Sequence, residues 1–497
     1  MSQADAPSTA AITSVMRRES RLRTLLLLLV MSVTPSLLVG TSFPFVLTDL
    51  WLPLGPPFSH ITHAGLLFAG TFAVLLVVSG AVVRWRVSRP GLGVGMGPTV
   101  PGILEDLARR VGIEVEVQAF GGPKALGIES VAIGRRRIVR IAIPRLREAK
   151  TQPEAFRFTL AHELAHLAGG DPRTDRWIAC AYLTALAFFL MTFGNVLWVA
   201  GTNAAAMWRH GADAVVWSLK AAMFPLAADA LSMGTLAILL SFERRSAMRL
   251  REFHADVVAS ALVGPGTAAI DTLKAEEGGA LMRWLRRLWS DHPEKKFRRR
   301  ALTERRAVFD ADRILFVLQG YFAATTIELV LQLFFANGYP NVSSPLARQQ
   351  YLLQTFERLP QTTMGILVVA TLLVFVSGLL VFGRLKVFVE IIGAGQVSVW
   401  FFTQIPVLIG LGACLALASS QAVLWELYGK GWSFVALVLA DLDRLSLYAA
   451  YLLGVVAATM AVIGDKGRWS LTRAGAAVLA ALPIGFVFSA GLWFYAR

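Results

Sequence analysis

Cysteine and charged residues are both scarce in this chain of 497 residues. Its two cysteines, Cys180 and Cys414, lie far apart in apolar stretches, which excludes a disulfide framework and a cysteine-based metal cluster. Only 16% of the residues are charged, against about 25% in an average soluble domain. Hydrophobic residues make up 55% of the chain. This composition argues against a water-soluble enzyme and against a disordered or fibrous chain, and it indicates a membrane protein.

Apolar runs long enough to cross a bilayer recur along the whole sequence. A membrane-spanning helix needs about 20 predominantly apolar residues to cross roughly 30 Å of hydrocarbon. Nine runs meet this requirement: Thr24–Phe45, Ile61–Val83, Trp177–Ala200, Ala221–Phe242, Ile314–Phe335, Thr363–Phe382, Val399–Ser419, Ser446–Ile463 and Ala474–Tyr495. The first run is longer than the core of a signal peptide and has no clear cleavage site, so we interpret it as a retained span.

Acidic residues are also few, since 33 of them stand against 48 lysines and arginines and leave a net charge of +15. Of the basic residues, 41 lie before the first run or in every second loop, with sixteen in residues 84–176 and sixteen in residues 244–313. Cytoplasmic loops of membrane proteins carry such an excess. The pattern predicts a cytoplasmic N-terminus and an external C-terminus, and it explains the charge without a nucleic-acid partner.

The two most basic loops are large enough to fold, and both lie on the same predicted side of the membrane. In the first loop, Leu104–Val111 is a predicted amphipathic helix, and Ile128–Ile133 and Ile138–Ile143 are predicted strands. We therefore predict a mainly α, polytopic membrane bundle of about nine spans with a small α+β domain split between two cytoplasmic loops. Its predicted segments are a cytoplasmic tail (1–23), two spans (24–83), the first part of the domain (84–176), two spans (177–242), the second part of the domain (243–313) and a C-terminal region of about five spans (314–497).

The segment His162-Glu163-Leu-Ala-His166 carries the clearest chemical signal in the chain. A proline before it and two glycines after it suit the beginning and the end of a helix. On a helix, His162 and His166 lie one turn apart on one face, where two imidazoles can hold one Zn²⁺. Glu163 would then reach a bound water as the general base. The alternative is an ordinary surface helix with two solvated histidines.

A third ligand is offered by the later segment Glu252-Phe-His254-Ala-Asp256, in which two carboxylates lie one helical turn apart. Glu252 would complete a site of two histidines and one glutamate, with the fourth position left to water. Asp256 would accept the ring N–H of a ligand histidine and so fix its tautomer. His254 is a rival ligand, although it points off the face of the two carboxylates. An exposed acidic pair among arginines is the alternative without a metal.

These two motifs resemble those of the membrane metallopeptidases that include the HtpX heat-shock proteases and the CAAX prenyl endopeptidases. In that family HExxH is followed, after one or two spans, by ExxAD, and here two predicted spans separate His162–His166 from Glu252–Asp256. The resemblance covers roughly Leu104–Arg306. It implies a zincin-like catalytic domain with zinc held by His162, His166 and Glu252.

The resemblance also implies roles for residues outside the two motifs. His292 and Arg298 match a histidine and an arginine that lie near the substrate in relatives and help to hold the tetrahedral intermediate. For Arg298 the alternative is a basic patch that faces lipid. Relatives carry an Asn-Ala-Phe-type segment at the strand near the active site, and the corresponding residues here are Ala125, Leu126 and Gly127 after a lysine. They are the implied substrate contacts, without the asparagine of the family.

The implied function is that of a zinc-dependent endopeptidase in a bacterial cytoplasmic membrane, with Glu163 as the general base. The substrate would lie extended along the edge of the predicted sheet. A site at the cytoplasmic membrane surface favours membrane-associated, lipidated or misfolded protein substrates. Four alternatives remain: a zinc protease that cleaves within the membrane, a transporter, an antibiotic-sensor protease, and a non-catalytic scaffold that retains a zinc site. Charged residues beside HExxH argue against the first of these, and short external loops argue against the sensor.

Overall fold

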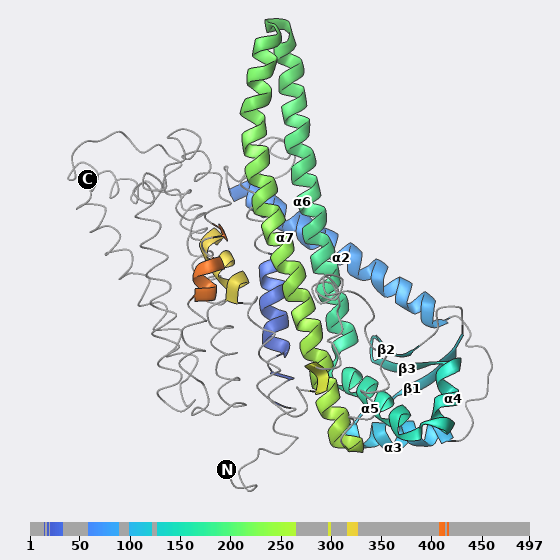
Figure 1. Ribbon diagram of the computed structural model, residues 1–497. Coiled ribbons are helices and arrows are strands. Elements are labelled where there is room, and N and C mark those ends of the chain that lie inside the picture. Colours follow the sequence, from blue (N-terminus) through green and yellow to red (C-terminus); the bar gives the residue numbers. More distant parts are fainter. Residues whose placement is uncertain are drawn as a thin grey trace.

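The architecture of the chain comes from a computed structural model. The structure describes residues 14, 17, 18, 20–32, 58–88, 99–121, 127–264, 297–299, 316–326, 407–412, 415 and 416. Within these ranges the protein is mainly helical and has one small sheet (Figure 1). The predicted mainly α class is therefore confirmed, and the small α+β unit lies in the first of the two basic loops.

A three-stranded sheet with the order β1-β3-β2 forms the centre of the α+β unit. β2 (Ile128–Ile133) and β3 (Arg136–Ala142) run antiparallel, and Gly134 between them has a φ of 58°, which glycine adopts without strain. Period-two alternation predicted both strands. β1 (Glu116–Phe120), which the sequence did not predict, runs parallel to β3. β3 is therefore the central strand, and β2 lies at one edge of the sheet.

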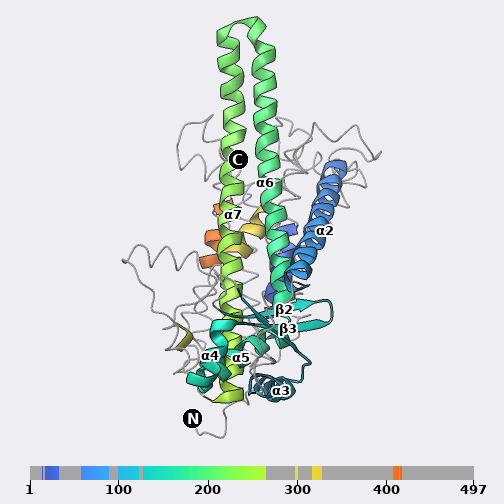
Figure 2. The same ribbon diagram turned by 90° about the vertical axis from the view of Figure 1, so that its right-hand side faces the viewer.

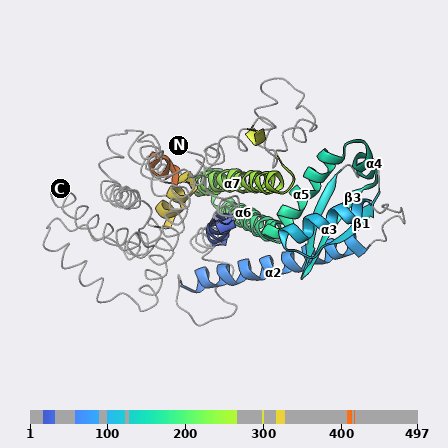
Figure 3. The same cartoon turned by 90° about the horizontal axis from the view of Figure 1, so that it is seen from below.

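Three helices pack around this sheet: α3 (Thr99–Val111), α4 (Ile143–Thr151) and α5 (Pro153–Gly169) (Figure 3). They share one apolar core with the strands. Its most deeply buried members are Leu107, Val139, Ile141, Leu160, Ala161 and Leu164. Each fully buried aliphatic side chain stabilises the fold by about 1.5–3 kcal/mol. Because α5 lies within this core, the helix that carries HExxH is fixed by packing on the sheet side.

A long antiparallel hairpin of α6 (Asp171–Met207) and α7 (Ala212–Val263) rises from the α+β unit (Figures 1 and 2). The turn between them is η2 (Trp208–His210) followed by a glycine. The hairpin contains the predicted spans 177–200 and 221–242. Its far part leaves large apolar side chains exposed, among them Leu190 at 73% and Trp198 at 71%. The lower part of α7 instead packs against α5 and so reaches the HExxH motif.

One stretch of the described residues, Gly65–Ser88 in α2 (Phe58–Ser88), is long and apolar enough to cross a membrane. Its most apolar window has a mean hydropathy of 2.5 and is almost entirely unburied within the protein. This helix agrees with the second predicted span, Ile61–Val83. The count of about nine spans is not confirmed, because this is the one such stretch found within the described residues, and residues 33–57 and most of residues 300–497 lie outside them.

Two helical segments of the C-terminal region touch at a pair of glycines. A Cβ added to Gly320 would collide with the backbone of Ile409, and a Cβ added to Gly412 would collide with the backbone of Val317. Helices in membranes approach this closely where small residues lie at their interface. The contact therefore joins segments that belong to two of the predicted C-terminal spans.

Candidate metal centre

Helix α5 places His162 and His166 one turn apart on the same face, as the HExxH spacing predicts. The helix begins at Pro153 and is followed by Gly170, whose φ of 79° ends the helix in the left-handed region. Both imidazoles are buried, and their Nε2 atoms lie 3.1 Å apart. Two nitrogen ligands of one small ion therefore face the same point.

The third group of the centre comes from α7. Oxygens of the Glu252 carboxylate lie 3.5 Å from Nε2 of His162 and 3.4 Å from Nε2 of His166. One ligand atom from each of the three residues lies within 4.8 Å of the others. Ligands about 2.0–2.1 Å from a tetrahedral ion are about 3.3 Å from one another, so this donor set fits one tetrahedral metal ion. The three residues predicted to be ligands are thus brought together.

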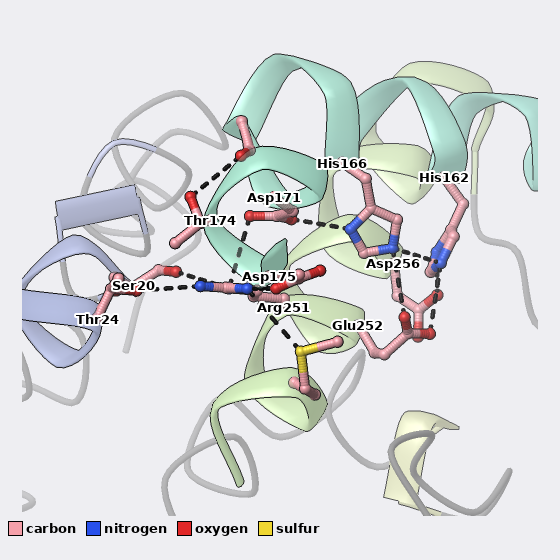
Figure 4. A network of polar contacts seen from close by, with 12 residues as sticks. Ser20, Thr24, His162, His166, Asp171, Thr174, Asp175, Arg251, Glu252 and Asp256 are labelled. Atoms are coloured by element: carbon pink, nitrogen blue, oxygen red, sulfur yellow. Dashed lines mark hydrogen bonds and ion pairs between the residues drawn. The ribbon is translucent and has the colours of Figure 1, made fainter. Parts of the chain in front are cut away.

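Each histidine is held from behind by a buried carboxylate (Figure 4). Nδ1 of His162 donates to Oδ1 of Asp256 over 2.9 Å, and Nδ1 of His166 donates to Oδ2 of Asp171 over 2.8 Å. A carboxylate can only accept, so these bonds place the ring proton on Nδ1 and leave Nε2 for a metal. The sequence predicted this contact for Asp256. Asp171 was not among the predicted site residues, although an acidic residue five positions after the second histidine was a usable signal.

The Arg298 guanidinium lies against Asp256 at the back of the centre. Its Nε donates to Oδ2 of Asp256 over 2.7 Å, and its Nη2 donates to Oδ1. The arginine is buried and Asp256 is fully buried, so their charges compensate each other away from water. The structure therefore brings Arg298 to the centre through the same carboxylate that holds His162. Its predicted companion, His292, lies outside the described residues.

Electrostatics at the centre follow from burial and from these contacts. Burial favours the neutral form of His162, but hydrogen bonds with Asp256 and Glu252 outweigh it and raise the pKa to about 9. Burial opposes charge on His166 as well, yet Asp171 and Glu252 raise its pKa well above the usual value. In the metal-free protein the surrounding carboxylates therefore favour additional protons on the two rings. Binding of a metal must displace them.

Asp256 titrates in the opposite sense. Burial alone would raise the pKa of its carboxyl group. Hydrogen bonds from Arg298 and His162 more than offset burial and hold that pKa below its usual range. Asp256 therefore stays ionised at neutral pH, as an acceptor for a histidine N–H requires.

Glu163 follows His162 on α5 and is half-buried. Its negative charge is one of those that raise the pKa of Arg298, although burial of the guanidinium acts against them. The Glu163 carboxylate therefore lies close enough to Arg298 for their charges to interact. This placement is compatible with the predicted role of general base.

The other predicted residues lie apart from the three ligands. His254 is buried on α7, and it lines a separate cavity of about 320 Å³ together with Thr24 and Trp177. Ala125 and Leu126 lie outside the described residues. Gly127 is described, and its carbonyl oxygen accepts the N–H of Ala142 over 3.0 Å. That carbonyl therefore belongs to the sheet.

The sequence of the chain was compared with protein families and with known proteins. Residues 132–306 match the model of peptidase family M48, and this segment includes both histidines, Glu252 and Arg298. A stretch of 181 residues is 28% identical to proteins named Protease HtpX from Pseudomonas paraeruginosa (strain DSM 24068 / PA7) and from Pseudomonas aeruginosa (strain LESB58). The match covers 35% of this chain and 56% of those relatives, so the chain spans about half their length. No solved structure matches. The resemblance expected from the motifs is confirmed, since residues 132–306 of the chain resemble peptidase family M48 and its HtpX proteases.

Proposed function

We propose that the chain is an integral-membrane, zinc-dependent endopeptidase. One observation carries the proposal: the Nε2 atoms of His162 and His166 and the Glu252 carboxylate converge within 4.8 Å on the M48 segment. Nitrogen and carboxylate ligands of this number are those of catalytic zinc sites that keep a fourth position open. The proposed ligands are these three residues.

Bound zinc would supply a Lewis acid that lowers the pKa of water from 15.7 toward about 7. The chain's own groups do the rest of the work. Glu163 takes the proton from the attacking water and passes it to the leaving amine, which requires a carboxylate next to the ligand histidines. Asp256 and Asp171 keep the two imidazoles in the tautomer that presents Nε2.

We assign Arg298 and His292 to the stabilisation of the tetrahedral intermediate, by resemblance to the family. Arg298 carries its positive charge beside the centre and keeps Asp256 ionised. That charge favours negative charge that develops on a substrate carbonyl oxygen. The test of this role is separate from that of the ligands, because an Arg298→Gln variant retains His162, His166 and Glu252.

The substrate is proposed to pair with the edge strand β2. The carbonyl of Ala132 accepts a hydrogen bond from Arg176 over 2.9 Å, on the edge of β2 away from β3. Because backbone groups alternate along a strand, those of Ile128 and Ser130 also point away from β3. β2 packs beside α5, so a peptide added there would run past the HExxH helix. Ala125, Leu126 and Gly127 immediately precede this edge.

The location of the centre supports membrane-associated, lipidated or misfolded protein substrates. The basic residues flank the HExxH and ExxAD segments, and we infer from them a multi-pass topology with the centre at the cytoplasmic face. The apolar helix Gly65–Ser88 and the exposed apolar side chains of the α6–α7 hairpin support a bilayer around the chain. A free soluble peptide would not need this placement.

Zinc content and hydrolysis in the purified full chain test the proposal. We expect about one zinc per chain for the wild type, and a Glu163→Gln variant that retains zinc but hydrolyses a membrane-protein substrate about 10²- to 10⁴-fold more slowly. Glu105→Gln, at an exposed residue of α3, is the matched control and should be fully active. Absence of zinc, or equal hydrolysis by wild type and Glu163→Gln, contradicts the enzyme. Zinc without hydrolysis in any variant would identify a scaffold.

A further inference from the structure

The N-terminal helical segment, residues 20–32, packs against α7 close to the metal centre. Its side chains Leu26, Leu27, Val30 and Met31 are almost fully buried. Arg23 forms a two-pronged ion pair with Glu243 of α7, with Nε–Oε1 at 2.6 Å and Nη2–Oε2 at 3.1 Å. Both side chains are buried, and separating them would leave a buried charge without compensation. The segment is therefore firmly attached to the helix that supplies Glu252.

Arg251 lies on α7 about 12 Å beyond Glu243, immediately before the proposed ligand Glu252. Its side chain is only 3% exposed and occupies the junction of three elements (Figure 4). On one side Nη2 donates to Oγ1 of Thr24 over 3.0 Å, and Nε lies 3.5 Å from Oγ of Ser20. Nη1 pairs with Asp175, and the same Nε that faces Ser20 lies 3.7 Å from Oδ1 of Asp171.

Asp171 divides its two oxygens between Arg251 and a ligand histidine. Oδ2 accepts the N–H of His166, whereas Oδ1 faces Arg251. The orientation of this carboxylate therefore depends on where the guanidinium lies. A guanidinium is a rigid plane of donors, so contacts that fix Nη2 at Thr24 and Nε at Ser20 also fix the direction in which Nε faces Asp171. A continuous series of polar contacts thus leads from Thr24 through Arg251 and Asp171 to His166.

Thr24 is suited to this position by its hydroxyl group. Oγ1 donates to the carbonyl of Ser20 over 2.8 Å and accepts from Arg251. The first contact directs the lone pairs of the hydroxyl toward the guanidinium. Valine has the same shape without either contact, and serine retains both. The side chain can therefore be tested without a change in packing volume.

We propose that residues 20–32 are a supporting element of the metal centre. Thr24 and Ser20 orient Arg251, Arg251 orients Asp171, and Asp171 holds His166 with Nε2 toward the metal. These are positioning residues, since none of them belongs to the three ligands. The inference rests on the proposed function in one respect, namely that the ion held by His162, His166 and Glu252 is zinc.

The experiment compares Thr24→Val, Thr24→Ser and Thr184→Val in the purified full chain. Thr184 is the matched control, because it is fully buried on α6 and its hydroxyl makes the same backbone bond, to Cys180 over 2.8 Å, without an arginine. Zinc affinity is measured by competition with a chromogenic chelator. Hydrogen exchange of residues 162–176 is measured in the metal-free protein.

We expect Thr24→Val to lower zinc affinity about 3- to 10-fold, because loss of a direct carboxylate partner costs about 10- to 100-fold and Thr24 acts one step further away. It should also speed hydrogen exchange in residues 162–176, while Thr24→Ser and Thr184→Val remain like the wild type. Wild-type affinity and exchange in Thr24→Val overturn the proposal. Equal losses in Thr24→Val and Thr184→Val also overturn it, because they would reflect general loosening.

Substitute variants and the metal-free readout cover the cases in which Thr24→Val does not fold or the proposed function is wrong. If Thr24→Val does not fold, Ser20→Ala and Arg251→Lys replace it, since Arg251→Lys retains the charge and loses the planar fork. If the wild type binds no zinc, the proposed function fails while the exchange of the metal-free protein still decides this inference. If zinc binds and Glu163→Gln stays active, the peptidase fails and both readouts still apply to the support of His166.

Discussion

The two helices that build the metal centre contribute to it in different ways. α5 supplies both histidines from a single turn, so their separation follows from helix geometry. α7 supplies Glu252 and Asp256 from a helix of 52 residues, and their position depends on how that helix packs. The distance between the two Nε2 atoms is 3.1 Å, and the distances to the Glu252 carboxylate are 3.4 and 3.5 Å. Tertiary packing thus brings the Glu252 carboxylate about as close to the histidines as one helical turn brings the two histidines to each other.

Small side chains allow this close packing. Ala165 of α5 and Ala255 of α7 are almost fully buried in one cluster with Val258. Ala165 lies next to a ligand histidine in sequence, and Ala255 lies between Glu252 and Asp256. The comparison teaches that half of the centre depends on local geometry and half on an interface. The following predictions test whether the two halves are equally necessary.

The largest effect is expected from loss of a ligand on either helix. His166→Ala on α5 and Glu252→Ala on α7 should each lower zinc affinity about 100- to 1,000-fold, the share of one ligand in a binding energy of about 10–16 kcal/mol. Equilibrium competition with a chelator measures the change. His210→Ala, in the turn at the far end of the hairpin, should bind zinc normally. Wild-type affinity in Glu252→Ala would remove α7 from the ligand set and leave α5 as the only supplier.

A smaller effect is expected from the carboxylates behind the histidines. Asp171→Asn and Asp256→Asn should each lower zinc affinity about 10- to 100-fold, because the ring N–H loses an ionised acceptor. Asp256→Asn should also lower the thermal unfolding midpoint more, since it leaves the buried Arg298 without its anion. Asp213→Asn, in the first turn of α7, is the control. Equal midpoints for the two variants would show that Arg298 does not depend on Asp256.

The interface itself can be perturbed without touching a ligand. Ala255→Leu adds volume to a fully buried position and should destabilise the fold by about 1–3 kcal/mol, with a parallel loss of zinc affinity as α7 moves away from α5. Chemical denaturation and metal competition measure the two effects. The same change at Ala261, an exposed position of α7, should leave both unchanged. Normal zinc affinity in destabilised Ala255→Leu would mean that the ligands do not depend on this packing.

The pH dependence of zinc binding tests whether protons and zinc compete for the two histidines. The pKa of His162 is raised to about 9, so in the metal-free protein its contribution to stability is complete below about pH 6.5 and is lost as pH rises through 9. Zinc requires the neutral ring, so its affinity should rise about tenfold per pH unit, per proton displaced, between pH 6.5 and 9. Calorimetry in buffers of different ionisation enthalpy counts the protons. A buffer-independent heat at pH 7 would show that the histidines are already neutral.

The sequence predicted the local half of the centre in detail. HExxH fixes His162 and His166 through helical periodicity, and the glycine that ends α5 marks its boundary. The predicted strands β2 and β3 also match, because alternation along a hairpin is a local property. These features depend on residues within a few positions of one another.

What the sequence did not predict depends on long-range contacts. β1 (Glu116–Phe120) is a short strand whose residues pair with residues 22 positions later in β3, so no turn or alternation identifies it reliably. No pattern in the sequence assigned a role to Arg251, and only the fold brings it beside Thr24 and Asp171. Glu252 was identified through a motif, whereas its distance from the histidines comes from packing alone. The sequence motifs therefore identified the proposed metal ligands, whereas the residues that hold those ligands in place became visible only in the folded structure.

Gly170 is the only residue between the end of α5 and the start of α6. The joint is a single left-handed residue, and the first residue beyond it, Asp171, holds His166. The short connection couples the orientation of α6 directly to that of α5. A thicker or thinner bilayer changes the tilt of a helix that spans it. We propose that the α6–α7 hairpin is embedded in the membrane. A change in the tilt of α6 would then move Asp171, its first residue, and so change the orientation of the His166 ring that Asp171 holds.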